Sequence, residues 1–201
     1  MNKENLIKKL YDIGGLKFGA FKLKTGLLSP FYIDLRVTVS YPEILKTISD
    51  LMWNKVKNLK FDFLCGIPYT ALPFATIMSV ENTVPMIMKR KELKGYGTNK
   101  LLEGVFEEGK TCLLVDDMIT NGLSKFESIK PIEEAGLKVQ DIVVLLDRQQ
   151  GGPENLKKKG YNLVSVFTVT EAVDLLLKVG KIDQKKYEIV INFIKDNQMK
   201  E

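Results

Sequence analysis

The sequence predicts an α/β protein with a central parallel sheet flanked by helices and a small N-terminal hood. Short runs of Val, Ile and Leu alternate with longer segments of helical period, and each run is apolar along its length. Such runs are typical of parallel strands buried on both faces. Near the N-terminus, two segments instead alternate apolar and polar residues around a turn containing Gly, Ser and Pro, which indicates a hairpin outside the main sheet.

The elements follow one another without a repeat or a linker. A first helix is expected over 6–13, ended by Gly14 and Gly15, then the hairpin of 21–24 and 31–34, then a helix over 42–57. The expected core strands are 61–66, 84–88, 111–115, 141–146 and 163–167, with helices at 72–80, 124–134 and 153–159 between them. Two amphipathic helices, 171–179 and one starting near Asp183, complete the pattern. We interpret residues 1–201 as one domain with a hood over about 1–40 and a helical tail over 171–201.

The composition excludes several kinds of chemistry. The 201 residues contain no histidine, so an imidazole base, an imidazole metal ligand and a Ser-His nucleophile are ruled out. The two cysteines, Cys65 and Cys112, each lie in an apolar run, which indicates buried thiols and a reducing compartment. No stretch approaches the roughly 18 apolar residues of a membrane span. We therefore expect a cytoplasmic protein with no membrane association.

The most informative segment is 113–124, where an apolar strand runs into Asp116 and Asp117 and then into a short polar loop that precedes a helix. Amide groups at a helix N-terminus bind anions, and Thr120 and Ser124 add hydroxyl donors. Gly122 lets the backbone approach a phosphate closely. The two carboxylates suit ribose hydroxyls or a metal carried by the ligand. The ordered set predicts a ribose 5-phosphate site.

Taken singly, each residue of this segment has a simpler interpretation. A strand end with turn-forming Asp residues, followed by helix-capping Thr and Ser, accounts for any one of them. The better-known phosphate motifs do not fit the chain, because no G-x-x-x-x-G-K-[ST] pattern exists and the segment 95–100 lacks the final glycine of a dinucleotide fingerprint. The order of the whole segment therefore carries the prediction.

A basic segment precedes this strand. Residues 86–100 hold five cations and one anion, 5 − 1 = +4, within a chain of net charge +5. Such a cluster suits a polyanionic ligand, although a solvated charged loop is the simpler interpretation. Nucleic acid is not favoured, because Tyr96 is the one aromatic residue in the segment. Gly95 and Gly97 around Tyr96 favour a lid, which 101–108 would complete.

The segment 113–124 resembles the signature of type I phosphoribosyltransferases, which bind 5-phosphoribosyl 1-diphosphate (PRPP). Asn121 and Ser124 stand where Thr is frequent, and both keep a polar group. From 17 to about 167 the chain resembles orotate phosphoribosyltransferases, most closely those found as domains of bifunctional UMP synthases. The stretches that carry this resemblance are 17–26, 29–34, 65–73, 90–97 and 146–149. Thr70 and Tyr96 depart from the bacterial pattern of Lys and His, in the manner of the UMP-synthase type.

The resemblance implies specific roles. PRPP would be bound by Lys24, Tyr69, Thr70, Arg90, Lys91, Lys94, Tyr96, Asp116, Asp117, Met118, Ile119, Thr120, Asn121, Gly122, Leu123 and Ser124. Orotate would be bound by Phe31, Tyr32, Ile33, Thr120 and Arg148. The catalytic residues would be Lys91 and Lys94, which neutralise the diphosphate, and Asp116 and Asp117, which orient the ribose. Mg²⁺ would be held mainly by the substrate, with these two aspartates nearby.

The residues themselves leave alternatives open at two places. Arg148 offers a planar fork for the orotate carboxylate, but a surface ion pair with Asp147 is the common arrangement. Phe31 and Tyr32 suit either a bound base or hood packing.

The reaction implied is orotate plus PRPP giving orotidine 5'-monophosphate and diphosphate. We expect a homodimer with shared active sites and, where the chain is part of a longer protein, a fused orotidine 5'-monophosphate decarboxylase domain. The rival functions are a transferase acting on a purine or uracil and a non-catalytic PRPP-sensing regulator.

Overall fold

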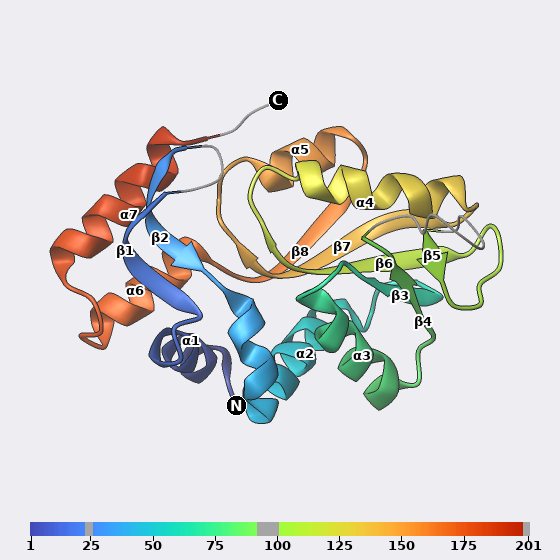
Figure 1. The fold of residues 1–201 in the computed structure, drawn as a ribbon, viewed down its shortest axis with the longest axis horizontal. Helices are drawn as coiled ribbons and strands as arrows, with labels where there is room; N and C mark the ends of the chain where they lie inside the picture. The colour runs from blue at the N-terminus through green and yellow to red at the C-terminus, as the bar shows by residue number, and fades with distance from the viewer. Residues whose placement is uncertain (23–25, 92–100, 199–201) are drawn as a thin grey trace.

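The computed structural model describes residues 1–22, 26–91 and 101–198. At its centre is a six-stranded sheet in the order β5-β4-β3-β6-β7-β8 (Figure 1). The strands are β3 (Phe63–Gly66), β4 (Met86–Lys89), β5 (Leu102–Glu103), β6 (Thr111–Ile119), β7 (Lys138–Asp147) and β8 (Asn162–Thr168). Neighbouring strands are parallel except β4 and β5, which are antiparallel. The sequence predicted the five parallel strands.

Helices cover both faces of this sheet. The helices α2 (Pro42–Val56) and α3 (Ala71–Asn82) lie on one face, and α4 (Leu123–Glu134) and α5 (Gly152–Lys158) on the other (Figure 1). Side chains of β6 point alternately to the two faces of the sheet. Leu113 and Val115 pack with α2 and α3, while Cys112 and Leu114 pack with α4 and α5. The expectation of continuous apolar strands buried on both faces is confirmed.

The hood and the tail lie side by side although they are far apart in sequence (Figure 1). The hood consists of α1 (Lys3–Asp12) and the antiparallel hairpin of β1 (Leu16–Lys22) and β2 (Leu28–Ile33), followed by a 3-10 helix, η1 (Leu35–Ser40). The tail helices α6 (Val169–Lys178) and α7 (Gln184–Asp196) contact α1 and β2 respectively. Two ion pairs join the ends, Lys3–Glu171 at 2.8 Å and Lys181–Asp12 at 2.6 Å.

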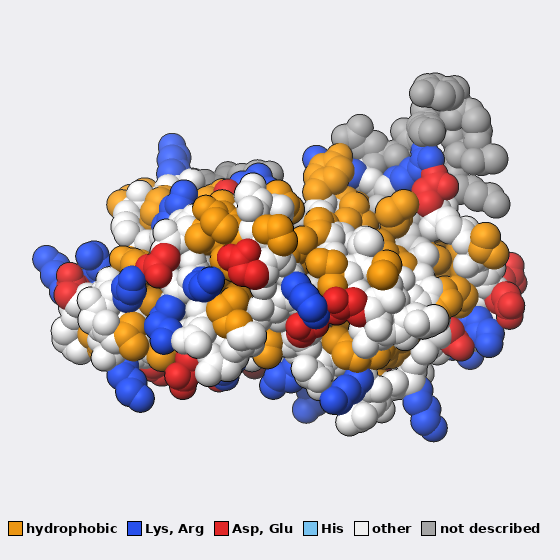
Figure 2. All heavy atoms as spheres, turned by 90° about the horizontal axis from the view of Figure 1, so that it is seen from below, with side chains coloured by type: hydrophobic (Ala, Val, Ile, Leu, Met, Phe, Trp, Pro, Cys, Tyr) orange, Lys and Arg blue, Asp and Glu red, His pale blue; other side chains and the backbone are white. Residues whose placement is uncertain are grey.

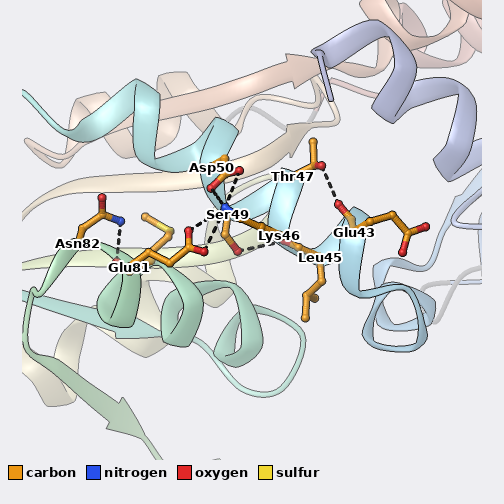
Figure 3. Close-up of polar contacts among 9 residues, drawn as sticks. Glu43, Leu45, Lys46, Thr47, Ser49, Asp50, Glu81 and Asn82 are labelled. Atoms are coloured by element: carbon orange, nitrogen blue, oxygen red, sulfur yellow. Dashed lines mark hydrogen bonds and ion pairs between the residues drawn. The ribbon is translucent and has the colours of Figure 1, made fainter.

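An ion-pair cluster joins α2 to α3 on the surface (Figure 3). Lys46 Nζ lies 2.9 Å from Asp50 Oδ1 on its own helix and 3.0 Å from Glu81 Oε1 on α3. All three side chains are well exposed, so water screens these pairs and their contribution to stability is small. The two helices are therefore held mainly by the buried side chains beneath them, such as Ile48 and Phe74.

The structure corrects several expected boundaries. Strand β6 runs four residues beyond the expected end at 115, because Asp116 and Met118 pair with Val144 and Leu146 of β7. The hairpin begins at Leu16 rather than at 21, and η1 was not predicted. The expectation that 101–108 completes a lid is wrong for Leu102 and Glu103, which form the edge strand β5. Within the described ranges, no helix combines the length and the apolar character needed to cross a membrane.

Candidate functional site

The carboxyl ends of β3 and β6 border a pocket of about 570 Å³. Ligands of open parallel sheets bind at this edge. The lining residues are Ile67, Pro68, Thr70, Asp116, Asp117, Met118, Thr120, Asn121, Leu123, Ser124, Lys125 and Glu127. The predicted ribose-phosphate segment therefore faces a single cavity, together with part of the loop after β3.

The loop after β6 has the geometry of an anion site. Gly122 has φ +91°, which a side chain would disfavour, and it directly precedes α4. Asn121 Oδ1 accepts a hydrogen bond from the Leu123 amide at 3.2 Å, while Thr120 and Ser124 line the pocket. Because α4 is a 12-residue helix, its first amides carry a partial positive charge toward this pocket.

The start of α5 supports this loop from behind. Asn155 is 2% exposed and donates from Nδ2 to the Asn121 carbonyl at 3.0 Å. A Cβ at Gly152 would lie 2.6 Å from Ile119 Cγ1 and 2.7 Å from the Thr120 carbonyl oxygen. Only glycine permits this approach, so α5 fixes the backbone of the predicted phosphate loop. Neither Asn155 nor Gly152 was predicted from the sequence.

The two adjacent carboxylates occupy different environments. Asp116 is 7% exposed, and its Oδ1 accepts from the Asp117 amide at 2.8 Å. Asp117 Oδ1 accepts from the Met118 amide at 2.8 Å. Burial, followed by the neighbouring charge of Asp116, raises the pKa of Asp117 to about 7. Asp117 is thus the carboxylate whose charge changes near neutral pH.

A buried lysine at the site was also not predicted from the sequence. Lys125 is 2% exposed and forms an ion pair with Asp116 Oδ2. Its Nζ also lies 2.7 Å from the Met118 carbonyl oxygen and 3.4 Å from Ser124 Oγ. One signal could have revealed it, because Lys125 precedes Ile129 by one helical turn and so occupies the buried stripe of α4.

The loop between β3 and α3 supplies the opposite wall. A Cβ at Gly66 would lie 3.1–3.2 Å from atoms of α3, so glycine allows the helix to begin close to the strand. Thr70 lines the pocket, whereas Tyr69 is 67% exposed and lies outside its lining. Lys91 Nζ lies 5.5 Å from the Tyr69 ring centroid, so the structure brings these two predicted residues together.

Arg90 has a structural partner. Its guanidinium forms an ion pair with Glu103 of β5, and its amide donates to the Leu101 carbonyl at 2.7 Å. These bonds hold Arg90 on the edge of the sheet. The predicted residues Lys24, Lys94 and Tyr96 lie outside the described residues.

Strand β7 lies next to β6, on the side away from β3, and Arg148 directly follows its end. Its amide donates to the Ile119 carbonyl at 3.0 Å, and its guanidinium carbon lies 4.8 Å from the Phe31 ring centroid. Nε and Nη2 are buried and have no hydrogen-bond partner among the described residues. Burial lowers the pKa of Arg148. The alternative ion pair is absent from the described part of the chain, where Asp147 Oδ1 instead accepts from the Gln149 amide.

The hood residues predicted to contact a base have different surroundings, and of these described residues only Phe31 lies against Arg148. Phe31 is 2% exposed, packs edge-on against Phe193 and lies beneath Arg148. Tyr32 packs against Phe21, and its hydroxyl accepts from Arg36 at 3.3 Å, while Ile33 is buried in the core. Hood packing therefore accounts for Tyr32 and Ile33, whereas Phe31 also supports the guanidinium.

The donor set fits a magnesium ion that is carried by a ligand. No group of three or more acidic or sulfur ligands with metal-site geometry occurs in the described ranges, so the protein does not form a cage there. Mg²⁺ usually retains waters and binds one or two carboxylates together with substrate phosphates. Asp116 and Asp117 beside the helix N-terminus match that description.

Comparisons with known proteins agree with this geometry. The phosphoribosyl transferase domain model matches residues 39–176. The chain is 44% identical to the uridine 5'-monophosphate synthase of Bos taurus, covering 96% of this chain and 41% of that protein. It is 40% identical to the orotate phosphoribosyltransferase of Caenorhabditis elegans, covering 97% of this chain and 87% of that protein.

Solved structures give the same result. The UMP synthase of Leishmania donovani superposes with a TM-score of 0.89 at 35% identity, covering 98% of this chain and 43% of that one. The orotate phosphoribosyltransferase of Aeropyrum pernix gives a TM-score of 0.76 at 30% identity, covering 89% and 99%. The chain thus spans less than half of these UMP synthases and most of the shorter relatives. It belongs to the phosphoribosyltransferase family of pentosyl-transferring enzymes and, within that family, to the orotate phosphoribosyltransferases.

Proposed function

We propose that this chain transfers the 5-phosphoribosyl group of PRPP to orotate, giving orotidine 5'-monophosphate and diphosphate in pyrimidine biosynthesis. The observation that carries the proposal is Arg148, whose guanidinium has two buried nitrogens, Nε and Nη2, without a hydrogen-bond partner within the described ranges. Its backbone amide bonds the Ile119 carbonyl, between the pocket-lining residues Met118 and Thr120. A planar carboxylate satisfies such a fork with two parallel hydrogen bonds. Orotate carries this carboxylate, whereas uracil and the purine bases do not.

The residues of the pocket would bind and orient the ribose phosphate. The N-terminus of α4 with Thr120 and Ser124 would hold the 5-phosphate, and Asp116 and Asp117 would orient the ribose hydroxyls. Phe31 would keep Arg148 in place and so set the position of the orotate ring. These contacts hold the attacking nitrogen close to C1 of the ribose and supply the orientation on which the rate depends.

Diphosphate departure leaves positive charge on the ribose, so the reaction needs charge stabilisation more than a base. Lys91 and Lys94 would neutralise the leaving diphosphate. Mg²⁺, held by the ligand near Asp116 and Asp117, would supply further positive charge to the diphosphate when bound. No step requires histidine, in agreement with its absence from the sequence.

The fall in orotate absorbance after addition of PRPP and Mg²⁺ tests the activity directly. Replacing Arg148 by Ala should raise the KM for orotate by about 10²-fold, because two charge-assisted hydrogen bonds are lost. The KM for PRPP should change little. Lys130→Met on the exposed face of α4 is the control. Equal loss of orotate and PRPP binding in Arg148→Ala would contradict the assignment.

Replacing Lys94 by Ala tests the transition-state role. We expect kcat to fall by about 10²-fold or more, the scale seen when one preorganised charge donor is lost. A normal kcat with a raised KM would show that Lys94 acts in substrate binding instead.

We propose a homodimer with shared active sites. Val80 on α3 is 74% exposed, Met88 on the adjacent β4 45% and Tyr69 67%, and apolar surface of this kind favours association. Figure 2 looks at the side on which α2 and α3 lie and shows hydrophobic patches among charged side chains. Mixing inactive Lys94→Ala and Asp117→Asn subunits should restore part of the activity if the sites are shared. Mixtures that stay inactive while the subunits exchange would contradict this arrangement.

Two broader assignments are also proposals. The buried free thiols of Cys65 and Cys112 support a cytoplasmic location, since they suit a reducing compartment. The partial coverage of the UMP synthases supports a fused orotidine 5'-monophosphate decarboxylase domain where the chain is part of a longer protein.

A further inference from the structure

Lys125 is a charged side chain in a place where charge is costly. It is 2% exposed at the start of α4, and a positive charge at a helix N-terminus opposes the helix dipole. A buried ammonium must also be paired and hydrogen-bonded to be tolerated. A residue with two such costs needs a compensating role, and the contacts of its Nζ indicate what that role is.

The Nζ contacts join both ends of the loop. The ammonium has three donors, and it reaches Asp116 Oδ2 on β6, the Met118 carbonyl at 2.7 Å and Ser124 Oγ at 3.4 Å on α4. Asp116 and Ser124 bracket the segment that binds the ribose phosphate under the proposed function. One side chain thus ties the strand end to the helix start.

The same contact sets the charge of the pocket. The charged side chains among the described lining residues are Asp116, Asp117, Lys125 and Glu127. Three carboxylates beside a phosphate site would repel the ligand, and Lys125 is the cation that offsets the most buried of them. The loop after β3 contributes Ile67, Pro68 and Thr70 to the lining, none of which is charged.

We propose that Lys125 is a positioning residue of the PRPP site, which fixes the Asp116 carboxylate and clamps the ribose-phosphate loop in its binding shape. The inference rests on the proposed function for the identity of the ligand. Lys125 acts chiefly through Asp116, so its removal weakens PRPP binding selectively and leaves the orotate side, built on Arg148, almost unaffected.

Steady-state kinetics of Lys125→Met and Lys125→Arg test the proposal. Methionine keeps most of the length of the buried side chain but removes the charge, and we expect the KM for PRPP to rise about tenfold or more. The KM for orotate should stay within about threefold, and arginine, which keeps the charge, should recover part of the loss. Lys130→Met, on the exposed face of the same helix, should behave as the wild type. A folded Lys125→Met protein with an unchanged KM for PRPP would overturn the proposal.

A second comparison decides the case if Lys125→Met does not fold. The double variant Asp116→Asn/Lys125→Met removes both members of the buried pair and leaves neither charge uncompensated. If Lys125 acts through Asp116, the double variant and Asp116→Asn alone should have KM values for PRPP within about threefold of each other. A much larger loss in the double variant would show that Lys125 does not act through Asp116.

Calorimetric binding of PRPP with Mg²⁺ separates this inference from the proposed function, because it requires no pyrimidine. A wild-type chain that binds PRPP but does not consume orotate would contradict the proposed reaction alone. The affinity for PRPP should then decrease in the order wild type, Lys125→Arg, Lys125→Met. Equal affinity of the wild type and Lys125→Met, or no binding by the wild type, would overturn the positioning role.

Discussion

The two sides of the site differ in how their charged groups are satisfied. On the phosphate side, Asp116 is bonded to Lys125 and to a backbone amide, and Asn155 supports the loop from behind. On the base side, Nε and Nη2 of the Arg148 guanidinium are buried and have no hydrogen-bond partner in the described ranges. The protein therefore builds the phosphate side to be complete by itself, while the base side gains its missing hydrogen bonds from an anionic ligand.

The largest expected effect comes from breaking the buried Asp116–Lys125 ion pair on the phosphate side. Asp116→Asn leaves the Lys125 ammonium buried without its counter-charge, which should lower the free energy of unfolding by about 3 kcal/mol. Urea unfolding followed by circular dichroism measures this loss. Adding Lys125→Met in the same chain should restore part of it. An Asp116→Asn protein as stable as the wild type would show that the pair is not needed to neutralise the buried lysine.

Substitution of Gly152, which lets α5 pack beneath the phosphate loop, should be almost as destabilising. In Gly152→Ala, the new Cβ would meet Ile119 and the Thr120 carbonyl at 2.6–2.7 Å, so overpacking should cost about 2 kcal/mol. The KM for PRPP should rise as well, because the displaced backbone belongs to the phosphate loop. The matched control is Gly19→Ala in the exposed part of β1, where the nearest atom would lie at 3.5 Å. Equal stability of both variants would show that the loop adjusts without cost.

The titration of Asp117 should appear in both activity and stability. With a pKa of about 7, its charge is lost below neutral pH, and kcat/KM for PRPP should then fall by up to about tenfold per pH unit. Because the folded pKa is raised above 3.8, the stabilising contribution is fully present below that value and is lost as pH rises through about 7. The Tm of Asp117→Asn should therefore decline less than that of the wild type between about pH 5 and pH 8.

An equal pH dependence of the two proteins would contradict the assignment of this titration to Asp117. If the Tm of Asp117→Asn declined as steeply as that of the wild type over the same range, another group would be responsible for the titration. The effect on activity is measured separately, by kinetics at saturating orotate. The fall in kcat/KM for PRPP at acid pH should then reflect weaker binding of PRPP and Mg²⁺.

The same contrast explains what the sequence could predict. The strand–Asp-Asp–loop–helix order at 113–124 is local, so the pocket it forms was predictable, as were the five parallel strands with their apolar runs. The helical period places Lys125 on the buried stripe of α4, but its partners, like the contacts of Gly152 and Asn155, depend on how α4 and α5 pack over the sheet, and no local pattern gives those partners. The edge strand β5 has only two residues and exists through its pairing with β4. The side chains of Tyr32 and Ile33 pack within the hood and core, so their contact with the base stays a prediction.

The smallest expected effect has the opposite sign and concerns the incomplete side. Arg148→Met removes two buried nitrogens, Nε and Nη2, that lack hydrogen-bond partners in the described ranges and keeps most of the apolar stem, so the free energy of unfolding should rise by about 1 kcal/mol. The contact with the Phe31 ring opposes this gain, but a cation over an aromatic face contributes roughly 0.5–2 kcal/mol and methionine retains favourable packing there. Orotate turnover should be lost while PRPP binding persists. A variant less stable than the wild type would mean that the ring contact outweighs the cost of burial, and the base side would then be as complete without ligand as the phosphate side.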